Sequence, residues 1–367
     1  MRSTTRIGVF PAWEENPYLN YLYLAARARG YETLHTTTYV GAVATLDRLE
    51  PGEVFHIHWT APIVQRADTT AEAETRLERF TTAVDAAKAR GVVIVWTIHN
   101  VLPHDARHVD IEVRLCRMLA DRADVIHVLT PATPRLTAAH YELPTEKVAH
   151  VPHPSYQGVY ATSMERAAAR ESFGLAESDR AVLFFGQMRP YKGLGNLFAA
   201  VDQLDQEEAD RTVLLLAGRT RPEDVPEVER TLARRVRVVR DHSFIDDADV
   251  ARWFQAADLA VYPYRAILNS GSLHLAATFG VRALLPAEGH LVDEFADEDW
   301  IRFFDPSEPI QGIRRSIVEA ASAPAPTTSA DFSRRLSPWR VSSAFADVLD
   351  EHSGRPAAIE REPVASA

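Results

Sequence analysis

Short apolar runs rich in valine, isoleucine and phenylalanine alternate along the chain with longer segments whose apolar residues recur at helical spacing. Such alternation is typical of parallel β-sheets whose strands are connected by crossover helices. In the first half of the chain, the runs predict strands at residues 6–10, 32–36, 54–58, 92–97, 125–129 and 148–152. The segments between them predict helices at residues 17–29, 71–90, 110–120 and 132–141.

A second series of the same kind follows a looser stretch at residues 155–178, which fits a connection between domains with a short helix. Two successive series predict two doubly wound, Rossmann-like α/β domains facing a cleft. Ligands of such sheets bind at the carboxyl ends of the strands, so polar residues directly after a strand are the first site candidates. The second series predicts strands at residues 181–185, 213–217, 236–240, 259–262 and 283–285, and helices at 194–204, 228–234, 247–256 and 272–279.

The composition is that of an ordinary globular protein. Of the 367 residues, 46% are hydrophobic and 25% are charged, which argues against a disordered, collagenous or coiled-coil chain. The 40 basic and 51 acidic residues give a net charge of −11, which argues against a nucleic-acid partner. The single cysteine, Cys116, lies in an apolar helical segment, and its isolation excludes a disulfide framework or a cysteine metal cluster.

No apolar run in the sequence approaches the ~20 residues that a membrane helix needs. The first residues lead directly into a predicted strand, without the apolar core of a signal peptide. We therefore expect a cytoplasmic protein. Any contact with the inner face of a membrane would be peripheral and made by surface residues.

The most specific local motif is the segment FFGQMRPYKGL at residues 184–194. A predicted strand ends at Gly186, a polar turn carries Arg189 and Lys192, and a helix begins near Gly193. Glycine lets a ligand approach the backbone closely, and a helix N-terminus offers amide donors to an anion. An arginine and a lysine here can neutralise two phosphates without a metal. The alternative is a simple turn with two solvated cations.

This segment resembles the Gly-x-x-x-x-x-Lys-Gly phosphate-binding turn that opens the C-terminal domain of GT-B fold glycosyltransferases. The resemblance is strongest to the large retaining family that includes sucrose synthases and bacterial mannosyl and glucosyl transferases, and the order of elements agrees over nearly the whole chain. It implies that Arg189 and Lys192 contact a nucleotide diphosphate. It also implies that a C-terminal helix crosses back onto the N-terminal domain.

The expected domain boundaries follow from the two series and this resemblance. Residues 1–160 form the acceptor-side domain, and residues 161–336 form the domain that binds the nucleotide sugar. The crossover helix occupies residues 337–352. The remaining residues, 353–367, are rich in Pro, Ala and charged residues and are expected to be a disordered tail.

A second polar cluster, HNVLPHD, follows directly after the apolar strand at residues 92–97. Titrating groups at a strand's carboxyl end are candidates for catalysis. By the resemblance, His99 is the histidine beside the transferred sugar, where it can hydrogen-bond a sugar hydroxyl. His104 and Asp105 are further acid–base candidates. The alternative is that His99 and Asn100 only cap a helix or satisfy loop carbonyls.

A third polar segment runs from Asn269 through Ser270 and Gly271 to Ser272, at the start of a predicted helix. Its amides and hydroxyls suit a phosphate, because a helix N-terminus attracts negative charge. An ordinary N-capped helix would explain the same residues without any ligand.

The sequence departs from the resembled family in this helix. Many members carry two glutamates here, the first near the sugar and the second on the nucleotide ribose. Counted back from Gly280, these positions fall at Ile267 and Leu275, which cannot ionise. The absence of both carboxylates puts the family's usual donor and its retaining mechanism in question.

Two weaker features remain open. His56 and His58 are two positions apart in a predicted strand and so point to one face, which suggests a metal-binding site. No third ligand has suitable spacing, and core or cleft-lining histidines are the commoner situation. Glu14 and Glu15 follow the first strand and could supply a base, although solvated loop carboxylates are commoner.

These observations predict a hexosyltransferase that moves a hexose from a GDP- or UDP-sugar to an acceptor hydroxyl in glycan, glycolipid or glycoconjugate synthesis. Arg189, Lys192 and the helix amides would stabilise the leaving diphosphate, so we expect no metal and no other cofactor. The expected acceptor is a carbohydrate, a lipid-linked compound or a small molecule.

Three alternatives stay open. The resemblance favours retention of configuration, in which the departing phosphate takes the acceptor proton, whereas an inverting enzyme would use Asp105 or His99 as its base. A nucleotide-sugar epimerase or hydrolase is a second enzyme class for the same fold. A two-domain small-molecule binding protein is the non-enzymatic alternative.

Overall fold

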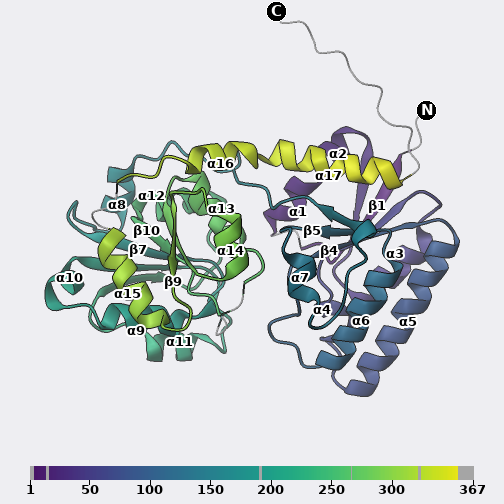
Figure 1. The fold of residues 1–367 in the computed structure, drawn as a ribbon, viewed down its shortest axis with the longest axis horizontal. Helices are drawn as coiled ribbons and strands as arrows, with labels where there is room; N and C mark the ends of the chain where they lie inside the picture. Colours follow the sequence, from purple (N-terminus) through teal and green to yellow (C-terminus); the bar gives the residue numbers. More distant parts are fainter. Residues whose placement is uncertain (1–3, 14–15, 190–191, 266, 321–323, 354–367) are drawn as a thin grey trace, which may run out of the picture. The chain divides into compact units, whose positions relative to one another are not determined.

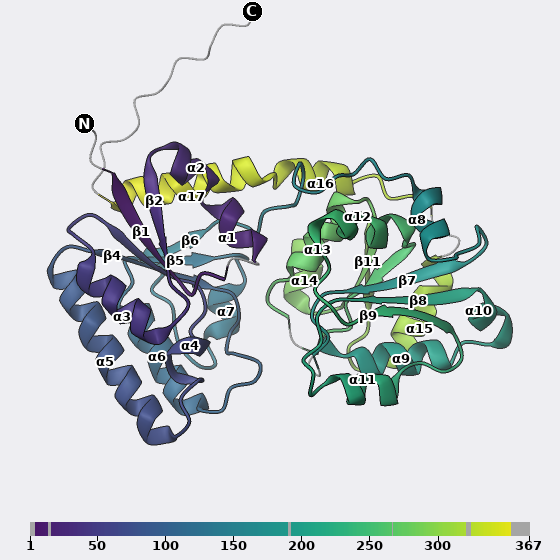
Figure 2. The same ribbon diagram turned by 180° about the vertical axis from the view of Figure 1, so that it is seen from behind.

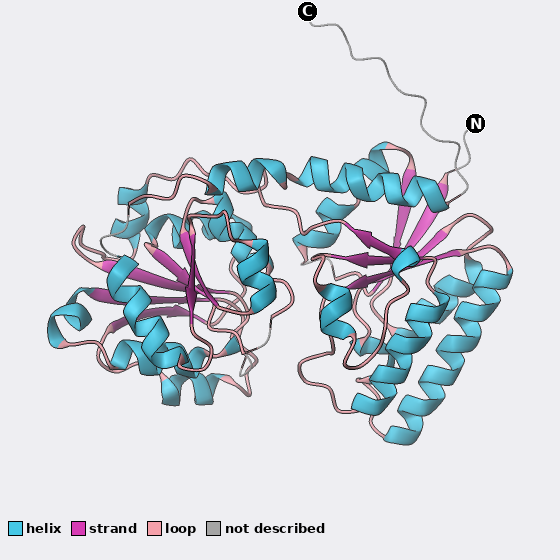
Figure 3. Cartoon of the chain, viewed as in Figure 1, coloured by secondary structure: helices cyan, strands magenta, loops and turns pink. Residues whose placement is uncertain are grey.

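The computed structural model describes residues 4–13, 16–189, 192–265, 267–320 and 324–353. The chain divides into two compact units, one formed by Met1–Pro152 and Pro338–Ala367 and the other by His153–Ser337. Each unit contains one six-stranded sheet in which every pairing is parallel, with helices on both faces (Figures 1, 2 and 3). The predicted fold class, two doubly wound α/β domains, is confirmed.

The sheet of the first unit has the strand order β2-β1-β3-β4-β5-β6, so the direction of winding reverses between β1 and β3. The central strands are buried on both faces, which explains why they read as continuous apolar runs. The strands are β1 (Thr5–Phe10), β2 (Tyr31–His35), β3 (Val54–Ile57), β4 (Val93–Ile98), β5 (Val125–Val128) and β6 (Val148–His150).

Two helical layers cover this sheet (Figure 1). One layer contains α3 (Tyr39–Arg48), α4 (Ala61–Val64), α5 (Thr70–Ala89) and α6 (Val109–Arg122), which pack against one another. The other contains α1 (Pro17–Leu22), α2 (Leu24–Ala28) and α17 (Pro338–His352). The short helix α7 (Thr133–Thr137) and a 3₁₀ turn at Thr145–Lys147 precede β6.

The last helix, α17, completes the core of the first unit although it follows the whole second unit in sequence. Phe345 on α17 is fully buried, with its ring centroid 5.2 Å from that of His56 and 5.9 Å from that of Tyr23. Arg29 Nη1 lies 2.7 Å from Asp350 Oδ2, which ties the end of α17 to the end of α2. Ser353 is the last described residue, so the expected tail beyond it lies outside the described residues.

The sheet of the second unit has the order β12-β11-β10-β7-β8-β9, and its winding reverses between β7 and β10. The strands are β7 (Arg180–Phe185), β8 (Thr212–Ala217), β9 (Arg237–Asp241), β10 (Leu259–Val261), β11 (Arg282–Pro286) and β12 (Ile301–Phe304). The helices are α8 (Arg166–Ser172), α9 (Leu194–Asp202), α10 (Gln206–Arg211), α11 (Val225–Thr231), α12 (Asp247–Ala256), α13 (Gly271–Thr278), α14 (Gly289–Glu294), α15 (Pro309–Ala320) and α16 (Ser329–Arg335).

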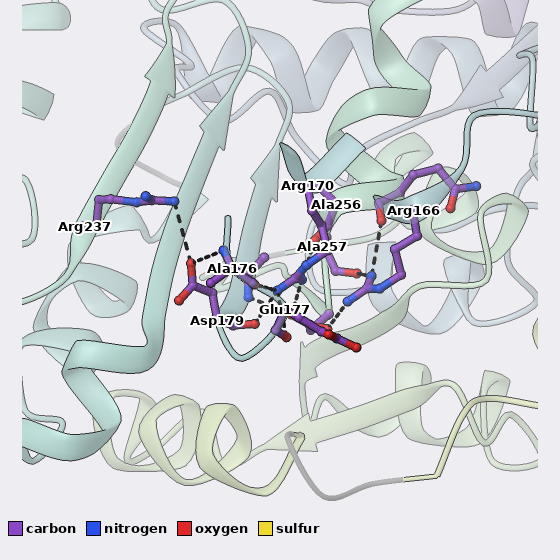
Figure 4. A network of polar contacts seen from close by, with 11 residues as sticks. Arg166, Arg170, Ala176, Glu177, Asp179, Arg237, Ala256 and Ala257 are labelled. Atoms are coloured by element: carbon purple, nitrogen blue, oxygen red, sulfur yellow. Dashed lines mark hydrogen bonds and ion pairs between the residues drawn. The ribbon is translucent and has the colours of Figure 1, made fainter. Parts of the chain in front are cut away.

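A buried arginine joins α8 to the central strands of this unit. Arg170 is 6% exposed, and its guanidinium donates to the carbonyl oxygens of Ala176 and Asp179 at 2.7 and 2.6 Å (Figure 4). It also lies 3.2 Å from Asp258 Oδ2, which accepts from the backbone amide of Ala181 at 2.7 Å. The network therefore holds the start of β7 next to the residue that precedes β10.

The boundary between the units lies earlier than the predicted residue 160, because residues 153–160 belong to the second unit. The backbone amide of Ser155 donates to the carbonyl oxygen of Leu336 at 2.7 Å, and that of Tyr156 donates to Thr278 Oγ1 at 3.1 Å. These bonds fasten the connection to α13 and to the end of α16. The apolar–polar pattern of this loop gave no indication of them.

Several elements differ from the sequence prediction. The helix predicted at residues 17–29 is interrupted at Tyr23, whose side chain is buried. The strand β12 was not predicted, because it is a four-residue edge strand with only its two end residues buried. Within the described ranges, no helix combines the length and the apolar character needed to cross a bilayer.

Candidate active site

The predicted phosphate-binding residues gather in the second unit at the carboxyl ends of β7 and β10. These strands are neighbours at the point where the winding of the sheet reverses, which is where doubly wound sheets bind ligands. Gly186 follows β7 directly, and the loop after β10 leads to Ser270 and α13. Pro190, Tyr191 and Ala266 of these loops lie outside the described residues.

The two loops approach each other closely. Gly186 has a φ of 130°, and a Cβ at this position would lie 3.1 Å from Ser272 Oγ and 3.9 Å from Lys192 Nζ. Gly193 has a φ of 73°, and a Cβ there would lie 1.8 Å from the carbonyl oxygen of Pro263. Only glycine fits this contact, which brings the turn after β7 against the loop after β10.

The ammonium group of Lys192 is oriented by an aromatic neighbour. Its Nζ lies 3.1 Å from the hydroxyl oxygen of Tyr264 and 4.4 Å from the centre of the Tyr264 ring. The same hydroxyl lies 3.4 Å from Ser270 Oγ. Gly186, Lys192, Ser270 and Ser272 therefore form one polar cradle, which we call the anion cradle. Tyr264 was missed by the sequence prediction because nothing in its local pattern marks it as a partner of Lys192.

The N-terminus of α13 contributes to the anion cradle. The helix begins at Gly271, and its N-cap residue Ser270 is extended and makes no side-chain capping bond. Positive partial charge at this end of the helix favours an anion. Asn269 precedes the cap and is half-buried.

The structure separates Arg189 from this cradle. Its Nη1 lies 3.7 Å from Asp224 Oδ2, and its Nε and Nη2 donate to Gln187 Oε1 at 3.3 and 3.2 Å. The side chain is 18% exposed. A diphosphate would have to draw the guanidinium away from Asp224, so Lys192 is the better placed of the two predicted cations.

Ile267 and Leu275 occupy the two positions at which the resembled family carries glutamates, so neither position presents a carboxylate. Leu275 is 5% exposed and belongs to the core side of α13. The carbonyl oxygen of Ile267 accepts a hydrogen bond from His290 Nε2 at 3.0 Å.

The first unit carries a cavity of about 140 Å³ at the carboxyl ends of β3 and β4, lined by both strand ends and the loop after β4. His99 is half-buried in this wall, with its ring stacked on Trp59 at 4.2 Å between centroids and with the edge of Tyr18 at 5.2 Å. Its Nε2 lies 3.1 Å from His58 Nδ1. We call this cavity the His99 pocket.

The other acid–base candidates of this loop lie differently. His104 lines the His99 pocket, whereas Asp105 does not line it and its side chain is exposed. Geometry therefore favours His99 over Asp105 as the group that meets a substrate. Glu14 and Glu15 lie outside the described residues.

His56 and His58 are buried core residues that point to one face, as the strand alternation predicts. Their ring centroids are 4.0 Å apart, and both hydrogen-bond the hydroxyl of Tyr23, at 2.6 and 2.7 Å. Burial lowers the pKa of both imidazoles well below the usual value, so both are neutral at pH 7. In the described part of the chain, no group of three or more His, Cys, Asp or Glu residues is arranged to hold a metal ion.

A buried carboxyl beside the His99 pocket was missed by the sequence prediction. Glu112 on α6 is fully buried, accepts from Thr60 Oγ1, and accepts from Gln65 Nε2 at 2.6 Å. Burial raises its pKa. Gln65 Oε1 in turn accepts from the backbone amides of Arg107 and His108 at 2.7 and 2.9 Å. The pair therefore holds the end of the loop that carries His99.

Replacing Lys192 by alanine is expected to weaken the binding of a nucleoside diphosphate by about 1–3 kcal/mol, because a charge-assisted contact is lost. Isothermal titration calorimetry with GDP and UDP measures the change, and Arg189→Ala is expected to have the smaller effect, because Arg189 already pairs with Asp224. Lys88→Ala is a matched control, because Lys88 pairs with Asp124 in the first unit. Unchanged affinity in a folded Lys192→Ala protein would remove the phosphate assignment.

This chain is similar to known proteins in both sequence and fold. Residues 179–284 match the family model described as glycosyl transferases group 1. The chain is 25% identical over 329 residues to GDP-mannose:glycolipid 4-beta-D-mannosyltransferase of Xanthomonas campestris pv. campestris, covering 87% of this chain and 85% of that protein. It is 26% identical over 207 residues to D-inositol 3-phosphate glycosyltransferase of Corynebacterium glutamicum, covering 51% of this chain and 50% of that protein.

Among solved structures, HepE of Anabaena in complex with UDP and glucose matches with a TM-score of 0.71 and 14% identity. The match covers 95% of this chain and 100% of that chain. At this identity the likeness concerns the fold alone. It agrees with the two parallel sheets described above, and the predicted resemblance to GT-B glycosyltransferases is confirmed.

Proposed function

We propose a donor, an acceptor class and a stereochemical course for this chain, which is a hexosyltransferase of the glycosyl transferases group 1 type with the GT-B fold. The enzyme transfers mannose from GDP-mannose to a hydroxyl group of a lipid-linked saccharide. The observation that carries the nucleotide-sugar assignment is the anion cradle, in which Lys192, Ser272 and the N-terminus of α13 converge on the backbone at Gly186.

The choice of donor and acceptor draws on the relative from Xanthomonas campestris, which is named for GDP-mannose and a glycolipid and is similar over most of both chains. A lipid-linked acceptor would bring the enzyme to the inner face of a membrane, where surface residues would hold it peripherally. UDP-sugar is the competing donor, since the solved structure with the same fold contains UDP.

The anion cradle supplies what departure of the diphosphate needs. Negative charge grows on the phosphate oxygen as the bond to the anomeric carbon breaks, and a preorganised cation stabilises that charge more in the transition state than in the ground state. Tyr264 holds Lys192 in place through its hydroxyl and ring face, so little reorganisation is required. On this basis we propose that the reaction proceeds without a divalent metal.

We further propose that the reaction inverts the anomeric configuration, in contrast to the retention favoured from the sequence. The same relative is named for a β-linked product, and the sugar of GDP-mannose is α-linked, so that name describes an inversion. Two findings in this chain support the proposal: the glutamate positions are occupied by Ile267 and Leu275, and His99 lines a pocket at the carboxyl end of β4.

In the proposed step, His99 is the general base. The acceptor oxygen forms a bond to the anomeric carbon from the face opposite the diphosphate, while the carbon–phosphate oxygen bond breaks and its electron pair stays on GDP. His99 takes the proton of the acceptor hydroxyl. Trp59, whose ring stacks on His99, lines the same pocket and provides apolar surface against which a sugar ring can lie.

A two-part experiment tests this function. A thermal-shift panel of GDP, UDP, ADP and TDP is expected to show the largest stabilisation with GDP, because the preferred nucleotide binds the folded state most tightly. GDP-mannose is then incubated with and without a lipid-linked oligosaccharide, and the anomeric proton of the product is read by NMR. We expect a β-mannoside that forms only with the acceptor.

The other outcomes are equally informative. Release of mannose at the same rate without any acceptor would indicate a hydrolase, and an α-mannoside would restore the retaining mechanism. A larger shift with UDP than with GDP would overturn the donor while leaving the enzyme class intact.

A further inference from the structure

An unbroken chain of hydrogen bonds runs through the core of the first unit and ends at His99. From His99 Nε2 it passes to His58 Nδ1 at 3.1 Å, and from His58 Nε2 to the hydroxyl of Tyr23 at 2.7 Å. The hydroxyl lies 2.6 Å from His56 Nδ1. The members of the chain, which we call the histidine chain, are His99, His58, Tyr23, His56, Thr97, His127 and the carbonyl group of Val151.

The far half of the histidine chain is just as tightly connected. His56 Nε2 lies 2.6 Å from Thr97 Oγ1, which lies 2.8 Å from His127 Nδ1. His127 Nε2 lies 2.8 Å from the carbonyl oxygen of Val151. Apart from half-buried His99, every side chain of the histidine chain is at most 1% exposed.

The carbonyl at the far end sets the direction of every bond in the half next to it. A carbonyl oxygen can only accept, so His127 must donate from Nε2. A neutral imidazole that donates from one nitrogen accepts at the other, so Nδ1 of His127 accepts the hydroxyl proton of Thr97. Thr97 has then used its only proton and must accept from His56 Nε2.

The directions of the remaining bonds are fixed in the same way as far as the His99 pocket. His56 accepts at Nδ1, so Tyr23 donates its hydroxyl proton to His56 and accepts from His58 Nε2. His58 is then left with Nδ1 as its acceptor, and His99 donates to it from Nε2. Burial lowers the pKa of His127 to about 4 and lowers those of His56 and His58 well below the usual value, and it raises that of Tyr23. These groups are therefore neutral at pH 7, as the assignment requires.

We propose that the histidine chain is a tautomer lock: it holds His99 in the form protonated at Nε2, so that Nδ1 is the nitrogen that accepts a proton in the His99 pocket. Tyr23, His58, His56, Thr97 and His127 are positioning residues that act on the reaction only through His99. The inference deepens the proposed function, because the base role of His99 belongs to that function, whereas the lock itself is a property of the folded chain.

The end of the histidine chain argues against the alternative that it conducts protons to solvent. The Val151 carbonyl accepts a hydrogen bond but cannot pass a proton on, and each imidazole before it is buried where a positive charge is costly. Phe345 of α17 covers the middle of the chain, with its ring centroid 5.2 Å from that of His56 and 5.0 Å from that of His127. A proton taken by His99 therefore leaves by the pocket, and the chain serves orientation.

The test reads the tautomer directly. In the full chain labelled with ¹⁵N-histidine, the ring signals that vanish in His99→Gln identify His99, and their chemical shifts report which nitrogen carries the proton. We expect Nε2–H in the wild-type protein. In Tyr23→Phe, His58 Nε2–H has no acceptor, and an orphaned buried donor is less tolerable than an orphaned acceptor. His58 is then expected to protonate at Nδ1 and donate to His99, which shifts His99 towards Nδ1–H.

A pair of variants at Thr97 separates the lock from a loss of folding. Thr97→Ser keeps the hydroxyl and is expected to keep the wild-type tautomer, whereas Thr97→Val removes the link to the Val151 carbonyl and is expected to populate the other tautomer. Tyr31→Phe is the matched control, because Tyr31 is a buried tyrosine of the same unit whose hydroxyl bonds Asp350 and Ser353 at the end of the chain's last helix. It is expected to leave the signals of His99 unchanged.

Turnover is measured on the same variants. Tyr23→Phe and Thr97→Val are expected to lower kcat about 10- to 100-fold with the KM for GDP-mannose within about twofold, because base catalysis is impaired while the anion cradle is intact. His99 in the Nδ1–H form in the wild-type protein, or unchanged in Tyr23→Phe, would overturn the lock. A switched tautomer with unchanged turnover would support the lock and overturn the base role of His99.

Discussion

Replacing His99 by glutamine is expected to lower kcat by about 10²- to 10⁴-fold, the range that a positioned general base contributes. Glutamine can still donate a hydrogen bond to His58 from its amide, and it fills much of the space against Trp59. It cannot take up a proton. The loss should therefore fall on the chemical step, and the KM for the nucleotide sugar is expected to stay within about twofold.

Two variants make this result specific. Asp105→Asn is expected to change kcat less than about threefold, because Asp105 is exposed and does not line the His99 pocket. His140→Gln is a matched control for the substitution itself, since His140 lies after α7 and outside that pocket. If Asp105→Asn were the severe variant and His99→Gln the mild one, the base would be Asp105, which is the other candidate of the same loop.

Acidification is expected to destabilise the protein well before its carboxylates are protonated. Burial lowers the pKa of His127 in the first unit and of His153 in the second unit to about 4. In the unfolded chain both groups have the usual value near 6.5, so between pH 6.5 and 4 the unfolded state binds more protons than the folded state. The stabilisation is complete above the unfolded pKa and is lost as the pH falls through this window.

The size of the effect follows from the shift. Between pH 7 and pH 5, each of His127 and His153 is expected to remove about 2 kcal/mol from the free energy of unfolding. His56, His58 and His274 act in the same direction, since burial lowers the pKa of each. Glu112 acts in the opposite direction, because burial raises its pKa and the folded state then retains a proton as the pH falls.

Urea unfolding at pH 7, 6 and 5, followed by circular dichroism, measures this loss. His127→Gln should flatten the pH dependence, because it removes one titrating group from the core, although it lowers stability at pH 7. His352→Gln, at the exposed end of α17, is the matched control and should leave the dependence unchanged. A free energy of unfolding that is constant from pH 7 to pH 5 would contradict the neutral state of the buried histidines.

Local patterns were sufficient for the elements that carry the site. The strand at residues 92–97 was predicted because β4 is buried on both faces and therefore reads as a run of apolar residues. The start of α13 was predicted at residue 272 and lies at Gly271, because its polar N-terminal residues precede an apolar helix. Both signals need only neighbouring residues.

Partners distant in sequence were beyond the reach of these patterns. Asp224 faces Arg189, and Tyr264 orients Lys192, across 35 and 72 positions of the chain (224 − 189 and 264 − 192). The residues next to Asp224 and Tyr264 in the sequence do not distinguish them from an ordinary surface aspartate or loop tyrosine. The sequence therefore predicted two equivalent phosphate-binding cations, although Arg189 already has a carboxylate partner in the folded chain, Asp224.

The sequence by itself determined two parallel α/β domains, the polar residues at the carboxyl ends of their strands, and the resemblance to GT-B glycosyltransferases. These follow from the order of apolar runs and from short motifs, which the chain carries whether or not it is folded. Only the tertiary structure decided that His56 and His58 belong to a hydrogen-bonded chain ending at His99, and that α17 closes the core over it. The reason is physical: a hydrogen bond needs two groups within about 3 Å, and only folding places β3, β4 and β5 side by side and packs Tyr23 against them.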